Sequence, residues 1–146
     1  MEQSRVNKGE VKGEIERVFD ASALMAFLQD EPEAREVEEL IERTGKANQA
    51  KLICVIHLGE VWYNVARRRL DADQIINRLL SLDFTIVNVD WELTHQASKL
   101  KYKFKLGFGD CYAAALAQLR GAELVTRDTD FKKLEREVKV RLLKGK

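Results

Sequence analysis

The sequence predicts a three-layer α/β/α domain built around a mostly parallel central sheet. Short apolar runs rich in β-branched residues alternate along the chain with longer helical stretches, which is the pattern of strands joined by helical crossovers. With 146 residues, the chain has the length of one ordinary domain. Its hydrophobic fraction of 45% is enough for a core. The chain contains no run of about 18 apolar residues, so the sequence predicts no membrane span.

In the first half of the chain, residues that begin and end helices separate the apolar runs. Ser22 is a residue type that caps helices, and Pro32 is tolerated in a first helical turn. Asp71 precedes a further helix, whereas Gly45 marks a helix end. We therefore expect strands at 17–20 and 51–56, and helices at 23–29, from about 31–33 to 43, at 58–70 and at 72–82.

The second half continues the alternation. Asp90 caps one helix, Gly107 and Gly109 mark a loop, and Asp110 opens a helix of small residues that Gly121 ends. We expect strands at 84–89, 123–126 and 138–142, the last at an edge of the sheet, and helices at 91–104, 111–119 and 131–136.

The N-terminal residues and the charge balance limit the classes of protein to which this sequence can belong. Residues 1–16 are polar and mixed in charge, so we expect an N-terminal extension before a domain at 17–146. They contain no apolar segment of a signal peptide, which predicts a cytoplasmic protein. Cys54 and Cys111 fit no zinc spacing and are expected to be reduced thiols. Charged residues make up 34%, yet the net charge is only +1, so a nucleic-acid site must come from local clustering.

Four acidic residues stand out by their position. Asp20 ends the first expected strand, Glu60 lies in the first turn of a helix, Asp110 opens a helix, and Asp128 follows a strand. Taken singly, each has an ordinary explanation as a cap, a turn residue or a surface acid. Because ligands of α/β proteins bind beyond the carboxyl ends of the strands, however, we expect the four to converge there.

Such a convergence predicts a hard-cation site. Carboxylates gathered at one sheet edge repel one another unless a cation neutralises them, and their oxygens suit Mg²⁺ or Mn²⁺. Asp130, two residues beyond Asp128, is expected to be a secondary metal ligand. Metals held by carboxylates can activate water and stabilise a leaving oxygen, so the pattern predicts phosphodiester hydrolysis.

The ordered set of these segments resembles the PIN-domain nucleases. The resemblance rests on Val18–Ser22, Glu60 before an apolar helix, Gly109–Ala117 and Leu124–Phe131, and it covers roughly residues 17–142. In order, spacing and length it is closest to the toxin component of VapBC-type toxin–antitoxin modules.

The resemblance implies a PIN-like fold and an Mg²⁺-dependent endoribonuclease that cuts single-stranded RNA, often as a dimer held inactive by a cognate antitoxin. It places the acidic residues of the family on Asp20, Glu60, Asp110 and Asp128, and its small hydroxyl positions on Ser22 and Thr126. Two features depart from the family pattern. Cys54 stands where a Ser or Thr is common, six residues before the glutamate, and the N-terminal extension is longer than usual for the toxins.

Further residues are candidates for contacts with RNA or a second copy. Arg67, Arg68 and Arg127 could contact RNA phosphates, although an arginine run is commonly a solvated helix face. His57 lies close to the acids, but a packed histidine is the more common outcome. The apolar content near Trp62, Tyr63 and Leu79 predicts a homodimer.

Four other functions compete with the toxin interpretation. A phosphatase of the haloacid-dehalogenase type needs an acid two residues after the first aspartate, where this chain has Ser22, and the acid pair and late lysine of a receiver domain are not evident. A PIN-domain RNA-processing nuclease outside a toxin–antitoxin pair, and a non-catalytic PIN-like binding module, remain alternatives.

Overall fold

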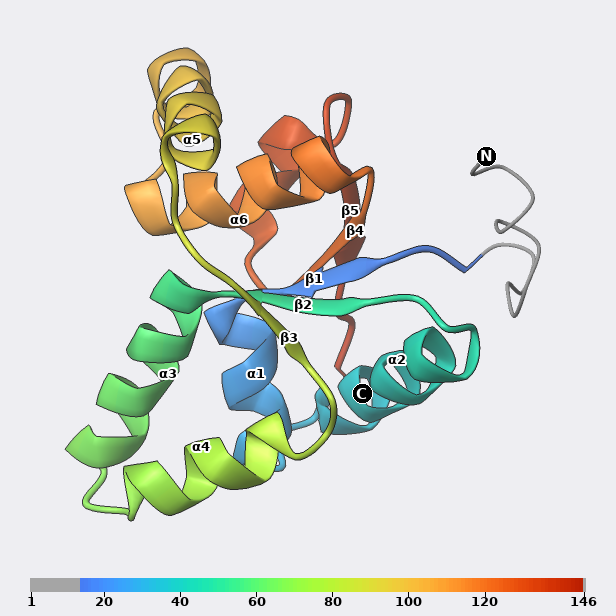
Figure 1. Cartoon of the computed structure of the whole chain (residues 1–146), viewed down its shortest axis with the longest axis vertical. Helices are drawn as coiled ribbons and strands as arrows, with labels where there is room; N and C mark the ends of the chain where they lie inside the picture. The colour runs from blue at the N-terminus through green and yellow to red at the C-terminus, as the bar shows by residue number, and fades with distance from the viewer. Residues whose placement is uncertain (1–13, 146) are drawn as a thin grey trace.

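The computed structural model describes residues 14–145 and contains a five-stranded parallel sheet in the order β3-β2-β1-β4-β5 (Figure 1). Every pair of neighbouring strands runs parallel. At the centre of the sheet, β1 lies next to β4, although the two strands are not consecutive in the chain. The strands are β1 Arg17–Phe19, β2 Lys51–Cys54, β3 Thr85–Val87, β4 Glu123–Thr126 and β5 Lys139–Leu142.

Helices cover both faces of the sheet. On one face, α1 to α4 pack against the sheet, and on the other lie α5, α6 and the short 3₁₀ helix η2 (Figure 1). This confirms the predicted three-layer α/β/α architecture. The bounds are α1 Ala21–Leu28, α2 Ala34–Lys46, α3 Val55–Arg67, α4 Ala72–Leu80, α5 Trp91–Phe104, α6 Phe108–Arg120 and η2 Thr129–Leu134.

The central strands are buried on both faces, which explains their continuous apolar runs. In β1, Val18 packs in the core beneath α5 and α6, whereas its neighbour Phe19 packs in the core with α1 to α4. Leu124 and Val125 of β4 divide between the two cores in the same way. Because successive side chains of a strand point to opposite faces, each residue pair anchors both helical layers.

Several expected boundaries are wrong, each for a local reason. Asp20, not Ser22, caps α1, because the Asp20 carboxylate accepts the Ala23 amide hydrogen. Residues 55–56 form the first turn of α3 rather than the end of a strand. The loop expected around Gly109 is helical, since α6 already begins at Phe108. The short helix expected at 131–136 is the 3₁₀ helix at Thr129–Leu134, whereas the edge strand expected at 138–142 is confirmed by β5, which joins the sheet in parallel.

The expected N-terminal extension, 1–16, lies largely outside the described residues. The part inside them is tied to the domain, because Glu14 accepts hydrogen bonds from Arg17 and Arg43 at 2.7 and 2.8 Å. These hydrogen bonds lower the pKa of Glu14. Glu16 pairs with Arg120 at 3.0 Å. The domain boundary at residue 17 stays a prediction.

The topology decides where a site can form. From β1 the chain crosses to α1 on one face, and from β4 it crosses to η2 on the other. The carboxyl ends of β1 and β4 therefore border a topological switch point, where α/β folds form their binding crevices. No helix among residues 14–145 has the length and apolar character needed to cross a membrane.

Candidate functional site

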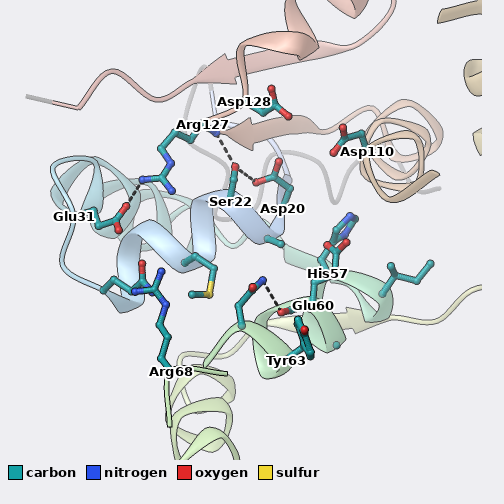
Figure 2. A pocket seen from close by; sticks show the side chains of 16 residues that line it. Asp20, Ser22, Glu31, His57, Glu60, Tyr63, Arg68, Asp110, Arg127 and Asp128 are labelled. Carbon is teal, nitrogen blue, oxygen red and sulfur yellow. Dashed lines mark hydrogen bonds and ion pairs between the residues drawn. The ribbon is translucent and has the colours of Figure 1, made fainter. Parts of the chain in front are cut away.

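A cavity of about 820 Å³ opens at this switch point, between α1, α3, the start of α6 and the turn after β4 (Figure 2). Four different elements contribute the predicted acids, and all four acids line the cavity: Asp20, Glu60, Asp110 and Asp128. Ser22, Arg68 and Arg127 line it too, whereas Thr126, Asp130 and Arg67 do not.

Asp20 lies at the base of the cavity and is only 5% exposed. Its carboxylate accepts hydrogen bonds from the Ser22 hydroxyl at 2.8 Å, the Thr126 hydroxyl at 2.6 Å and the Ala23 amide at 2.9 Å. Burial raises the pKa of Asp20, and the three hydrogen bonds partly oppose the rise. The two hydroxyls predicted from the sequence thus orient this carboxylate, and they stabilise its ionised form.

Thr126 and Ser22 also connect Asp20 to the turn that carries Asp128. The Thr126 hydroxyl accepts the Asp128 amide hydrogen at 3.0 Å, and the Ser22 hydroxyl accepts the Arg127 amide hydrogen at 2.9 Å. The start of α1 and the end of β4 are therefore held together by side-chain hydroxyls across the switch point.

Asp110 is the third residue of α6, where the helix dipole favours a negative charge. Even so, its pKa is raised to about 6 by burial first and then by the charges of Asp128, Asp20 and Glu60, against a smaller opposing effect of His57. The carboxylates at this end of the cavity are thus near enough to repel one another.

Glu60 and Asp128 complete the acidic end of the cavity. Glu60 is exposed at the first turns of α3, and Asp128 is half-buried at the N-cap of η2. The Asp128 carboxylate accepts the Asp130 amide hydrogen at 2.9 Å. Asp130 itself is exposed and does not line the cavity, and its role as a secondary metal ligand stays a prediction.

His57 joins the first turns of α3 and α6. It is 2% exposed, and its Nε2 bonds the Gly109 carbonyl at 2.8 Å. Burial lowers its pKa, but the Cys54 sulfur, the Gly109 carbonyl and the Asp20 charge outweigh that effect, so that the pKa is raised overall. The packed interpretation of this histidine is correct. Cys54, the departure from the family pattern, is the N-cap residue of α3 and makes no side-chain capping bond.

The donor set fits a divalent cation. None of the four carboxylates forms an ion pair with a lysine or arginine among the described residues. Within residues 14–145, no three acids, histidines or cysteines are close enough to surround a cation by themselves. Mg²⁺ needs only one or two carboxylates, since water and substrate phosphates fill its other positions. The cavity therefore offers hard oxygen donors whose negative charge no lysine or arginine among the described residues neutralises, and such donors suit Mg²⁺ or Mn²⁺.

The basic residues lie at the opposite end of the cavity (Figure 2). The Arg127 guanidinium pairs with Glu31 and Glu33, which holds the connection between α1 and α2 against the end of β4. Arg68 approaches the Gln29 amide, whose oxygen can accept its hydrogens at 2.8 Å. Arg67 does not line the cavity, and its guanidinium carbon lies 5.5 Å from the centre of the Tyr63 ring.

Sequence reasoning missed several cavity-lining residues, among them Met25, Gln29, Glu31, Ile56, Tyr63 and Asn64. The sequence gives a signal only for Tyr63 and Asn64, which follow Glu60 by three and four residues and so share its helical face. Of the three residues that marked the apolar content behind the homodimer prediction, Leu79 is buried in the core, at 1% exposed, so it adds nothing to an interface. Trp62 and Tyr63 remain available, at 43% and 59% exposed.

The family model described as PIN domain matches residues 17–137. This chain belongs to the PIN-domain family. The match spans the sheet from β1 through η2 and all four acids of the cavity. The resemblance inferred from the sequence is therefore confirmed, and so is the PIN fold.

Individual proteins are similar to this chain in sequence or in fold. VapC ribonuclease Mb0640 of Mycobacterium bovis is 28% identical over 126 residues, covering 78% of this chain and 91% of the relative. A toxin–antitoxin complex from Klebsiella pneumoniae contains a chain 25% identical, with a TM-score of 0.64 over 79% of this chain and 89% of that chain. VapBC2 from Rickettsia felis, bound to a promoter DNA fragment, contains a chain 17% identical, with a TM-score of 0.74 over 89% of this chain and 100% of that chain.

Proposed function

We propose that this PIN domain is a divalent-metal-dependent endoribonuclease that cuts single-stranded RNA as the toxin of a toxin–antitoxin pair. The observation that carries the proposal is the acidic end of the cavity. There, carboxylates from four separate elements share one opening without a lysine or arginine partner among the described residues, and burial, followed by the charges of the neighbouring carboxylates, raises the pKa of Asp110 to about 6. A purely structural cluster would be stabilised by arginine or lysine, whereas a metal site keeps its charge for the ion.

The side chains have separable roles in this proposal. Asp20, Glu60, Asp110 and Asp128 would hold Mg²⁺ or Mn²⁺, which when bound lowers the pKa of water and stabilises charge on a leaving oxygen. Ser22 and Thr126 orient the Asp20 carboxylate, and their hydrogen bonds favour its ionised form against the effect of burial. The Arg68 guanidinium, at the far end of the cavity, is available for a neighbouring RNA phosphate.

The partners are proposed from the relatives. Mb0640 is named a ribonuclease, and the two structural relatives are complexes of a toxin with an antitoxin. We therefore propose a cognate antitoxin for this chain, and a homodimer with Trp62 and Tyr63 near its interface. We expect the enzyme to act in the cytoplasm, where its RNA substrate is found.

The deciding experiment is cleavage of a single-stranded RNA with Mn²⁺ and with EDTA. Asp20→Asn keeps the shape of the side chain but removes its charge, so we expect cleavage to be lost while the far-ultraviolet circular dichroism spectrum is retained. Asp83→Asn is the matched control, because Asp83 is exposed, lies before β3 and has a φ of 66° that asparagine tolerates.

Each alternative function has its own outcome in this assay. A wild-type protein that binds no Mn²⁺ and cuts no RNA would favour the non-catalytic binding module. Mn²⁺-dependent cleavage without a co-purifying or co-encoded antitoxin would favour an RNA-processing nuclease. Equal cleavage by folded Asp20→Asn and wild-type protein would refute the site.

A further inference from the structure

Two of the acids that line the cavity, Glu60 on α3 and Asp110 on α6, lie next to a hydrogen bond that joins these two helices. His57 lies three residues before Glu60 on α3, so the two side chains lie on one face of the helix. Gly109 directly precedes Asp110 in the first turn of α6. The His57 Nε2 and the Gly109 carbonyl are 2.8 Å apart. Figure 2 shows His57 beside Glu60 and facing the side of the cavity that Asp110 occupies.

The acceptor of this contact determines which atom of the pair donates the hydrogen. A carbonyl oxygen only accepts hydrogen bonds, so Nε2 of His57 carries the hydrogen and donates it. The other ring nitrogen, Nδ1, is buried and makes no hydrogen bond of normal geometry among the described residues, although the nearby Cys54 sulfur raises the pKa of the ring. A buried unpartnered nitrogen costs free energy. Among the described residues, the Nε2 bond to the Gly109 carbonyl is therefore the contact that offsets the burial of this polar ring.

Gly109 is also closely approached by the side chain of Glu60. A Cβ atom at this position would lie 3.1 Å from Oε2 of Glu60. The backbone of Gly109 is thus enclosed between the His57 ring and the Glu60 carboxylate, both from α3. Any shift of the first turn of α6 would change the distance between Glu60 and Asp110.

We propose that His57 is a positioning residue, which holds the Gly109 carbonyl so that Glu60 and Asp110 keep a fixed separation across the cavity. Residues that orient metal-binding side chains typically change metal affinity on the order of 10- to 100-fold when they are removed. The inference rests on the proposed function for its metal readout, and on the structure alone for its readout of the α6 turn.

A matched pair of substitutions isolates the hydrogen bond. The amide nitrogen of glutamine reaches nearly the position of Nε2, so His57→Gln retains a donor to Gly109, whereas His57→Leu fills similar space without one. Ile76→Val, in the same helical layer but away from the cavity, controls for loss of packing alone. A fourth substitution, Gly109→Ala, keeps the donor and instead displaces Glu60.

Two measurements are made on each folded variant. The first is hydrogen exchange of the Cys111 amide, which forms the first helical bond of α6 with the Gly107 carbonyl at 3.0 Å. The second is Mn²⁺ affinity from electron paramagnetic resonance. We expect His57→Leu to exchange faster at Cys111 and to bind Mn²⁺ at least about 10-fold more weakly. His57→Gln and Ile76→Val should stay near wild type, and Gly109→Ala should lose Mn²⁺ affinity without faster exchange.

The outcomes separate this proposal from the proposed function. Wild-type protein that binds no Mn²⁺ would refute the metal site, and the exchange comparison between the leucine and glutamine variants would still decide the role of His57. Equal exchange rates for those two variants, or equal Mn²⁺ affinities where wild type binds the metal, would overturn the proposal.

Discussion

Replacing Asp110 by asparagine should stabilise the metal-free protein at neutral pH, although it removes a proposed metal ligand. The pKa of Asp110 is raised from 3.8 to about 6, so in the folded protein its ionised form is disfavoured by burial and by the charges of Asp128, Asp20 and Glu60. A carboxyl with a raised pKa binds its proton more tightly when folded than when unfolded. Its contribution to stability is therefore lost as pH rises from about 4 to above 6.

The size of the effect follows from the same shift. A difference of roughly two pH units corresponds to about 3 kcal/mol, at about 1.4 kcal/mol per unit. Asp110 is only half-buried, and solvent screening reduces this to about 1–2 kcal/mol. At roughly 3 °C per kcal/mol for a chain of this size, the asparagine variant should melt about 3–6 °C higher than wild type at pH 7.5 in EDTA.

The assay compares thermal melts of wild type and Asp110→Asn at pH 5 and pH 7.5, each with EDTA and with saturating Mn²⁺. In EDTA, the advantage of the variant should shrink toward pH 5, where Asp110 of the wild type is largely protonated. With Mn²⁺ at pH 7.5, the order should reverse, because only the wild type gains the full stabilisation by metal. An asparagine variant that melts below wild type in EDTA at pH 7.5 would refute the assigned repulsion.

Three further predictions follow from the placement of the other residues. Asp128→Asn should reduce RNA cleavage more than Asp130→Asn, because Asp128 lines the cavity and Asp130 does not; kcat values in the reverse order would contradict this. Mn²⁺ at 100 times its Kd should stabilise the wild-type fold by about 2.7 kcal/mol at neutral pH, less at pH 5 as Asp110 protonates, and an unchanged Tm at neutral pH would argue against a metal site. Light scattering at micromolar concentration should give the mass of a dimer, with Trp62→Ser and Tyr63→Ser weakening it, whereas a monomeric wild type would contradict the proposed homodimer.

The architecture could be predicted because it depends on patterns that are local in sequence. Val18 and Phe19, or Leu124 and Val125, are apolar at consecutive positions, which indicates a strand buried on both faces. Alternation of such strands with helices then leaves few topologies besides a parallel sheet. The helix start after Asp20 was placed too late because two neighbouring residues, Asp20 and Ser22, can both cap, and only the backbone geometry selects between them.

The acids of the site could be named from the sequence because each stands at the end of a strand or in a first helical turn, positions that meet at one edge of a parallel sheet. What their surroundings would be was decided only by the tertiary structure. The hydroxyls of Ser22 and Thr126 reach one carboxylate from elements over 100 residues apart, and His57 bonds the carbonyl of Gly109 across 52 residues. Likewise, Arg127 is paired by Glu31 and Glu33, whereas Arg68 borders the open cavity.

By itself, then, the sequence determined the fold class, the family and the four acids that line the cavity, since these follow from residue type and spacing along the chain. Only the tertiary structure decided the exposure of Glu60, the raised pKa of Asp110, the burial of Leu79 and the partner of His57. Burial and charge repulsion act between groups that are close in space, and the distances between elements remote in sequence arise when the two helical layers pack onto the sheet.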